Sequence, residues 1–381
     1  MIVTRLLALA LLASNSNGLA LPSIPFTGFE PTSQSFIVKL KPGHSCQSHF
    51  SRINGTLSKV ESSRATHFNS RIFNGYAIRL DDQATVKSLS SLDSVEYIEP
   101  DVAFSVASLV TQTNAPWGLH AITRSYDSSA GQGVDVYILD SGVYSNHTDF
   151  ANRVEQSPVF ARYTTTGDIF GHGTHVAGIA AGTRFGVAKQ ARIIDVKVIT
   201  DTGRGFASDI IAGLGWAVAH ANSTGRSSVF NLSLGGGTST ALDDAVMAVV
   251  NAGIHTVVAA GNANVDASEW SPARVPGVIA VGNVDINGVR SETSNYGSPV
   301  TVFAPGVNIT SAGINGPTSS RVDSGTSMAA PHVAGLVAYL IGLEGPHTPS
   351  EIKTRVQALA RADVLSGIPN GTVNLMSQNT L

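Results

Sequence analysis

The chain has 381 residues, of which 43% are hydrophobic and 13% charged, so it can bury a large core and is not expected to be disordered. Its formal net charge of −3 and the absence of any Lys/Arg run exclude the electrostatic footprint of a nucleic-acid-binding protein. Its single cysteine, Cys46, excludes an intrachain disulfide, and no histidine motif accompanies it as a catalytic thiol would require.

The first twenty residues have the layout of a secretory signal peptide. Arg5 precedes the apolar stretch Leu6–Ala13, and the small-x-small ending Gly18–Ala20 predicts cleavage after Ala20, so that residues 1–20 are removed. A membrane anchor is the alternative, but this apolar stretch is too short to span a hydrocarbon core of roughly 30 Å. The protein is therefore expected to be secreted, with no membrane partner.

Six Asn-x-Ser/Thr sequons fit passage through a glycosylating secretory route. Asn231 is expected to stay bare because it lies inside an apolar strand. The remaining glycosylation candidates are Asn54, Asn146, Asn222, Asn308 and Asn370.

A small α+β module is predicted for residues 21–109, with a folded core at about 35–102. Strands are expected at Ser35–Leu40, Asn74–Leu80 and Val95–Asp101, and a helix at Thr85–Leu92. The segment Phe104–Gln112 lacks a strong pattern and is expected to be the processing linker between this module and the next.

The second module, residues 110–381, alternates apolar runs with helical stretches. Strands that are apolar throughout indicate a parallel sheet covered by helices on both faces, so the predicted fold is a doubly wound, mostly parallel α/β domain. In such sheets the active site lies at the carboxyl ends of the strands. The runs are Val134–Leu139, Thr174–Ala181, Ala191–Ile199, Ala207–Ala221, Ser228–Leu234, Leu242–Ala252, Thr256–Ala260, Val278–Val281 and Ser327–Leu343.

Three segments place a reactive residue where a loop meets a regular element. Asp140 ends the apolar run Val136–Leu139, where a carboxylate can orient a histidine. Taken alone, its Asp-Ser-Gly sequence is more often a helix cap or a turn. His172 lies between two glycines at the start of a helix of small residues, where the backbone can approach closely.

The third segment runs from Ser324 to His332 and continues as an apolar helix. Ser327 lies in its first turn, near the positive end of the helix dipole and beside free amide groups, which suits a nucleophile whose attack creates an oxyanion. Alone, a serine here is most often an N-cap. His175 and His332 fall on the helices and are expected to be packed, and zinc is disfavoured because His172 and His175 are three residues apart instead of four.

In the order Asp140, His172, Ser327, these segments resemble the subtilisin-like serine proteases (peptidase S8), and among them the fungal proteinase K group. The likeness begins near Gln112–Leu119 and extends to Gly371–Leu375. It implies that Asp140 orients His172, that His172 takes the proton of Ser327, and that Ser327 Oγ attacks a peptide carbonyl to form an acyl-enzyme that water hydrolyses.

The resemblance also implies the groups that bind substrate. Asn262 would donate its side-chain amide to the oxyanion beside the Ser327 N–H. A strand followed by glycines can pair with an extended peptide, and an aromatic residue would line a distal pocket, which predicts a preference for large apolar or aromatic side chains in protein substrates. The substrate-binding candidates are Ser233, Leu234, Gly235, Gly236, Gly203, Gly205 and Phe206.

The first module resembles the inhibitor-like propeptide of the same family through Phe36–Leu40 and Tyr97–Asp101. The resemblance implies a precursor in which the propeptide helps folding and blocks the cleft as an intramolecular inhibitor, until the chain cuts itself near Leu109. A monomeric secreted endopeptidase is expected.

Two positions depart from the family pattern. Val176 stands where many relatives carry a thiol, so thiol reagents should leave activity intact. Relatives bind calcium through carbonyls matching Pro276 and Val278 plus a carboxylate, and this chain has Thr301 at the carboxylate position. Because the only charged ligand is lost, the calcium site is expected to be weak or absent, and no cofactor is expected to be required.

Other classes remain as alternatives. A binding protein that has lost activity is disfavoured because all four catalytic positions are intact, and a metallopeptidase because His-Glu-x-x-His is absent. A lipase-type hydrolase is disfavoured because no Gly-x-Ser-x-Gly surrounds Ser327. Activity is expected to be maximal above neutral pH, since His172 must be unprotonated to act as a base.

Overall fold

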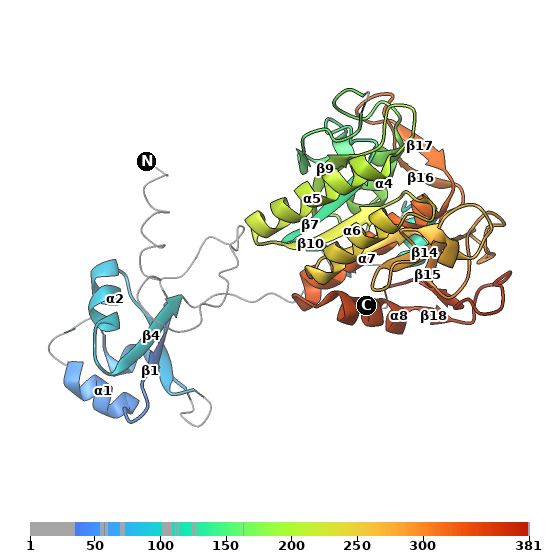
Figure 1. Cartoon of the computed structure of the whole chain (residues 1–381). Coiled ribbons are helices and arrows are strands. Elements are labelled where there is room, and N and C mark those ends of the chain that lie inside the picture. Colours follow the sequence, from blue (N-terminus) through green and yellow to red (C-terminus); the bar gives the residue numbers. More distant parts are fainter. Residues whose placement is uncertain are drawn as a thin grey trace. The chain divides into compact units, whose positions relative to one another are not determined.

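The computed structural model describes residues 35–53, 57, 60–68, 73–100, 109–110, 112, 114–123, 126–127, 129–162 and 164–379. The chain divides into two compact units, residues 1–106 and 107–381 (Figure 1). The predicted signal peptide and the Asn54 sequon lie outside the described residues, as does most of the predicted processing linker.

The smaller unit contains a four-stranded antiparallel sheet, in the order β2-β3-β1-β4, and two helices. Asp82 caps the second helix by accepting a hydrogen bond from the Thr85 amide. The first helix was not predicted, because its apolar residues are few among Ser, Gln, His and Arg. The elements are β1 (Ser35–Leu40), α1 (Cys46–Ile53), β2 (Ala65–His67), β3 (Gly75–Arg79), α2 (Gln83–Ser90) and β4 (Val95–Pro100).

The larger unit is built on a nine-stranded sheet, in the order β18-β19-β15-β14-β12-β10-β7-β9-β8, and every neighbouring pair is parallel except β18–β19. Its central strands are buried along their whole length, as their continuous apolar sequences predict. The strands are β7 (Val134–Asp140), β8 (Val154–Gln156), β9 (Arg192–Lys197), β10 (Ser227–Leu232), β12 (His255–Ala259), β14 (Ile279–Val284), β15 (Val300–Pro305), β18 (Arg361–Ala362) and β19 (Leu375–Met376).

Helices cover both faces of this sheet, which confirms the predicted doubly wound fold (Figure 1). Alternate residues of β7 enter the two cores: Ile138 packs with the helices of one face, and Tyr137 with those of the other. One core contains α4 (His172–Ala181), α7 (Thr326–Glu344) and α8 (Pro349–Leu359), and the other contains α5 (Ala207–Thr224) and α6 (Thr240–Asn251).

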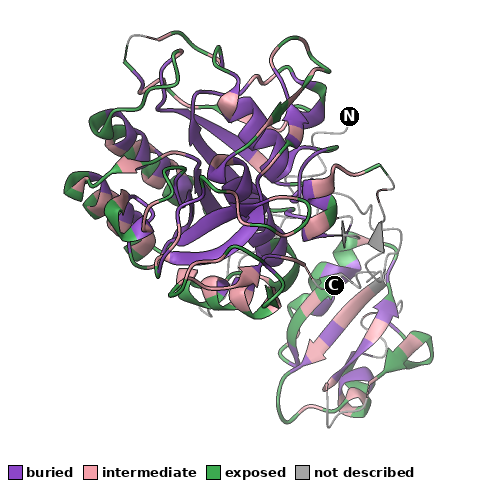
Figure 2. Cartoon of the chain, turned by 90° about the vertical axis from the view of Figure 1, so that its right-hand side faces the viewer, coloured by how far each residue is buried: buried purple, intermediate pink, exposed green. Residues whose placement is uncertain are grey.

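Helix α7 lies at the centre of the larger unit and is apolar on all sides. It is long and apolar enough to cross a membrane, but most of its residues, including Met328–Ile341, are buried in the protein core. Figure 2 shows the buried residues gathered in the interior of the larger unit. A short helix and several two-stranded pairs complete the unit: α3 (Trp117–Ile122), β5 (Leu109–Val110) with β6 (Tyr126–Asp127), β11 (Gly236–Gly237) with β13 (Trp270–Ser271), and β16 (Ile309–Ala312) with β17 (Ser320–Asp323).

The sequons differ in exposure. Asn231 is fully buried in β10, in agreement with the expectation that it stays bare. The candidates at Asn146, Asn222, Asn308 and Asn370 are all exposed.

Candidate active site

Three elements of the larger unit bring the predicted catalytic residues to one cavity of about 530 Å³. Asp140 is the last residue of β7, His172 the first of α4, and Ser327 the second of α7. Strand β7 is an interior strand of the sheet, between β10 and β9, and its carboxyl end lies where such folds place their sites.

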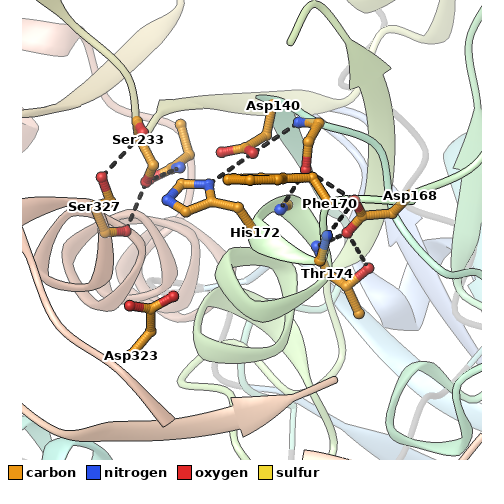
Figure 3. Close-up of polar contacts among 12 residues, drawn as sticks. Asp140, Asp168, Phe170, His172, Thr174, Ser233, Asp323 and Ser327 are labelled. Carbon is orange, nitrogen blue, oxygen red and sulfur yellow. Dashed lines mark hydrogen bonds and ion pairs between the residues drawn. The ribbon is translucent and has the colours of Figure 1, made fainter. Parts of the chain in front are cut away.

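Asp140 and His172 form a pair in which the carboxylate is buried and the imidazole is partly exposed. His172 Nδ1 donates to Asp140 Oδ1 at 2.8 Å, and the carboxylate is 1% exposed (Figure 3). The start of α4 can lie this close to the end of β7 only because residue 173 is glycine. A Cβ at Gly173 would lie 2.2 Å from the Gly142 carbonyl oxygen. Asp140 therefore fixes the imidazole in the tautomer whose Nε2 is free to accept a proton.

The charge around His172 favours its protonated form. Burial lowers the pKa of the imidazole, but the carboxylate of Asp140, with smaller contributions from Asp323 and Asp168, outweighs burial and raises that pKa above its ordinary value. A histidine held in this way is a stronger base than free imidazole.

Asp168 joins the end of β7 to the start of α4. Its Oδ1 accepts from Ser141 Oγ at 2.9 Å and from the Gly171 amide at 2.7 Å, and its Oδ2 accepts from the Thr174 amide at 2.9 Å (Figure 3). Ser141 Oγ in turn accepts from the Gly173 amide. Asp168 is a positioning residue that was not predicted from the sequence, although an acid shortly before a helix is a capping signal.

Ser327 is held against the end of β10. Its Oγ donates to the Ser233 carbonyl oxygen at 3.1 Å, while Ser233 Oγ donates to the Ser327 carbonyl oxygen at 2.8 Å. Asn231 Nδ2 donates to Ser233 Oγ at 2.9 Å and so fixes the bridging hydroxyl. The ring nitrogen of His172 opposite Asp140 faces the side where Ser233 and Ser327 lie (Figure 3).

Asn262 lines the same cavity and is oriented by the residue before Ser327. Its Oδ1 accepts from the Thr326 amide at 2.8 Å and from Thr326 Oγ1 at 3.0 Å. Within the described part of the chain, this leaves Asn262 Nδ2 as a donor toward the cavity. The first backbone N–H groups of α7 have no acceptor within the helix and carry partial positive charge. An anion beside Ser327 would therefore meet hydrogen-bond donors both from α7 and from Asn262.

The predicted substrate walls lie on this cavity with one exception. Phe206 is not among the lining residues, and the Arg162 guanidinium lies 4.4 Å from the centre of its ring. The lining includes the predicted Gly203, Gly205, Ser233, Leu234, Gly235 and Gly236, and also the unpredicted Phe170, Ile199, Ile210 and Trp270.

His175 and His332 are packed, as predicted. His175 Nε2 donates to the carbonyl oxygens of Ile309 and Arg321, and His332 Nδ1 donates to that of Met328. Burial lowers the pKa of each imidazole to about 4, so both are neutral at physiological pH.

The residues at the expected calcium position do not fit a calcium ion. Lys353 Nζ donates to the Val278 carbonyl oxygen at 2.9 Å, so an ammonium group of the protein itself already occupies this acceptor. Thr301 Oγ1 accepts from the Ala280 amide, and Thr301 brings no carboxylate. Across the residues that the structure describes, no group of three or more His, Cys, Asp or Glu could hold a metal.

Comparison with known families assigns both units. The model described as the subtilase family matches residues 131–372, and the model described as peptidase inhibitor I9 matches residues 35–107. The chain belongs to the subtilase family. Its smaller unit is an inhibitor I9 propeptide domain, and its larger unit is a subtilisin-like peptidase domain.

Named relatives agree with this assignment. The chain is 40% identical over 388 residues to the alkaline serine protease ver112 of Corniculantispora psalliotae, covering 99% of this chain and 98% of that protein. It is 44% identical over 319 residues to subtilisin-like protease 3 of Pseudogymnoascus destructans, covering 80% and 78% of the two chains. It is also 40% identical over 328 residues to a cuticle-degrading protease of Metarhizium anisopliae, covering 84% of each.

A solved structure, that of a cold-adapted subtilisin-like serine proteinase, matches with a TM-score of 0.67 and 39% identity, covering 71% of this chain and all of that one. This subtilase is thus a serine protease by family, with an inhibitor I9 propeptide domain preceding its peptidase domain.

Proposed function

We propose that this subtilase is a secreted endopeptidase, made as a self-processed precursor, in which Ser327 attacks peptide bonds. The observation that carries the proposal is the meeting of the Asp140–His172 pair, Ser327 and the free Asn262 amide at one cavity. A buried carboxylate, a basic imidazole and a hydroxyl at a helix N-terminus are the groups that acyl transfer requires.

Each group has a role in the reaction. Ser327 Oγ turns from the Ser233 carbonyl to His172 Nε2, transfers its proton there and attacks the substrate carbonyl carbon. The resulting oxyanion accepts hydrogen bonds from Asn262 Nδ2 and the Ser327 amide. His172 then gives the proton to the leaving amine, and the acyl-enzyme is hydrolysed by a water molecule that His172 deprotonates.

The glycine-rich walls suit an extended peptide. Ser233–Gly236 and Gly203–Gly205 offer main-chain groups on the two sides of the cavity, so the substrate binds as an added strand. At one end of the cavity the Trp270 indole lies against Gly235 and Gly261, because neither glycine has a side chain: an added Cβ would lie 2.5 Å and 2.7 Å from Trp270 Nε1. The apolar side chains that line the cavity, Trp270 and Leu234 among them, support a broad preference for large apolar or aromatic side chains before the scissile bond.

The precursor follows from the two units. The I9 domain acts as intramolecular inhibitor, and the chain cuts itself near Leu109. The Leu109–Val110 backbone pairs with Tyr126–Asp127 at the start of the peptidase unit.

Residues 1–20 direct secretion, and the exposed sequons Asn146, Asn222, Asn308 and Asn370 are compatible with that route. The mature enzyme acts outside the cell as a monomer on proteins, without a cofactor.

The test compares the secreted wild type with Ser327→Ala, using Ser324→Ala from the same segment as a matched control. Wild type and Ser324→Ala should have an intact mass corresponding to cleavage near Leu109 and should digest casein. Ser327→Ala should remain a precursor and be inactive. Maturation and casein digestion by Ser327→Ala at the wild-type rate would refute the proposal.

A further inference from the structure

Two charged residues of β17, Arg321 and Asp323, contact both the segment that carries His172 and the segment that carries Ser327. Side chains two residues apart on a strand point to the same side, and here Arg321 Nη2 binds Asp323 Oδ2 at 2.7 Å. The Arg321 side chain is 39% exposed and that of Asp323 is 27% exposed. An ion pair as exposed as this one adds little to folding stability, so its contacts with the two catalytic segments are what it can contribute.

Arg321 holds the chain on both sides of His172. Its Nη1 donates to the carbonyl oxygen of Phe170, two residues before His172, at 3.1 Å. A Cβ at Gly171 would lie 3.1 Å from Arg321 Nη1, so glycine leaves room for the guanidinium there. On the other side, Nε2 of the neutral His175 donates to the Arg321 carbonyl oxygen at 3.1 Å.

Asp323 holds the segment that leads to Ser327. Its Oδ1 accepts from the Ser324 amide at 2.9 Å, and Ser324 Oγ accepts from the Asn308 amide at 2.8 Å. Neither Arg321 nor Asp323 is among the residues that line the cavity. The ion pair therefore joins the two catalytic segments from outside the cavity.

Asp323 also brings a negative charge near His172 (Figure 3). Burial lowers the pKa of the imidazole and Asp140 raises it, and the next contribution in the same direction comes from Asp323, followed by Asp168. Asp140 lies at the end of β7 and Asp168 in the loop before α4, whereas Asp323 lies on β17. The cation that partners this third carboxylate is Arg321.

We propose that Arg321 and Asp323 are a pair of positioning residues that fix the loop of His172 relative to Ser327 and set the charge beside the imidazole. The inference rests on the proposed endopeptidase function. Ser327 Oγ must give its proton to His172, so a small change in their relative position lowers the rate. The imidazole must be neutral to act as a base, so the charge of the pair affects the pH range of activity.

The experiment measures kcat, KM and the pH profile of kcat/KM on a chromogenic peptide amide with mature Asp323→Asn and Arg321→Met. Asp323→Asn keeps an acceptor for the Ser324 amide but removes the charge, so the acid limb should move to lower pH while kcat on the plateau stays close to that of the wild type. Arg321→Met releases the Phe170 carbonyl and leaves Asp323 unpaired. Its kcat should fall about tenfold with little change in KM, and its acid limb should move to higher pH. Arg321→Lys keeps a cation beside Asp323 and should return the acid limb to its wild-type position.

The matched control is the ion pair of Arg355 and Glu344, whose side chains are 41% and 24% exposed and whose N–O distance is 2.8 Å. Glu344 is the last residue of α7, so at about 1.5 Å per residue it lies about 25 Å from Ser327. Arg355→Met and Glu344→Gln should leave both kcat and the acid limb unchanged.

Two results would overturn the inference: an acid limb that stays in place in Asp323→Asn, or a kcat in Arg321→Met no lower than that in Arg355→Met. Asp323→Asn gives its reading even if Arg321→Met does not fold. Failure of the proposed function is distinct, since Ser327→Ala would then cleave the peptide as fast as the wild type.

Discussion

Ser327 and Ser233 exchange hydrogen bonds: the Ser327 hydroxyl donates to the Ser233 carbonyl, and the Ser233 hydroxyl donates to the Ser327 carbonyl. The second bond fixes the first turn of α7 against the end of β10, and with it the position of the nucleophile. Ser233 Oγ also accepts a hydrogen bond from the buried Asn231 Nδ2.

Ser233→Ala should therefore reduce kcat by about tenfold, with the proton-transfer groups left in place, because a small displacement of a nucleophile is costly. The buried Asn231 Nδ2 would lose its acceptor, which should lower the free energy of unfolding by about 1–3 kcal/mol. Steady-state kinetics and denaturant unfolding measure the two effects. Ser233→Ala kinetics equal to those of the wild type would mean that the hydroxyl has no positioning role.

The raised pKa of His172 fixes the pH dependence. Because the base must be neutral, kcat/KM should rise with pH through a pKa above the ordinary 6.5 and reach its plateau on the alkaline side. In Asp140→Asn, burial acts without the carboxylate, so the acid limb should move to lower pH, and kcat should fall about 10⁴-fold. An acid limb that stays in place would show that Asp140 does not set this pKa.

The same ion pair affects stability with a defined sign. A histidine whose pKa is raised on folding stabilises the protein below its unfolded pKa, near 6.5, and this stabilisation is lost as pH rises through the folded pKa. As pH rises from the unfolded to the folded pKa of His172, kcat/KM should therefore increase while the contribution of this ion pair to the free energy of unfolding decreases.

Asn262 provides a test of oxyanion stabilisation. Asn262→Ala should lower kcat by about 10²–10³-fold with little change in KM, a magnitude taken from the equivalent change in a subtilisin. Thr326→Val keeps the backbone donor to Asn262 Oδ1 but removes the hydroxyl donor, so its loss should be smaller, about tenfold. A larger loss in Thr326→Val than in Asn262→Ala would contradict the assignment of Asn262 as the donor.

Lys353 makes chelator resistance an expected property. Since its ammonium binds the Val278 carbonyl where relatives would use calcium, EDTA should leave the melting temperature of the mature enzyme unchanged within about 2 °C. Lys353→Met should lower the melting temperature by about 3–6 °C, because a buried carbonyl loses a charged donor. Thr301→Asp combined with Lys353→Ala should gain calcium-dependent stability. A large drop with EDTA in the wild type would refute this account.

The sequence was most informative where local pattern and function coincide. Asp140 could be placed because a fully apolar run ends at it, and Ser327 because a long apolar helix begins beside it. These signals lie within a few residues of the site residue itself, so no tertiary information was needed to find them.

Contacts between distant segments could not be predicted in this way. Val278 and Lys353 are 75 residues apart, and nothing near either residue indicates that their atoms meet. The aromatic residue of the cavity shows the same limit. The sequence predicted Phe206 for this role, whereas Phe170 lines the cavity, with its ring packed against Gly203. Asp168 was missed because its four hydrogen bonds join two elements that only the fold brings together.

The most direct test of the central claim is the site of reaction with a fluorophosphonate, which phosphonylates an activated serine. Peptide mass mapping of the treated mature wild type should locate the adduct on Ser327, with proteolysis lost in proportion to labelling. His172→Ala should not be labelled under the same conditions. An adduct on another serine, or full proteolysis with Ser327 modified, would contradict the account.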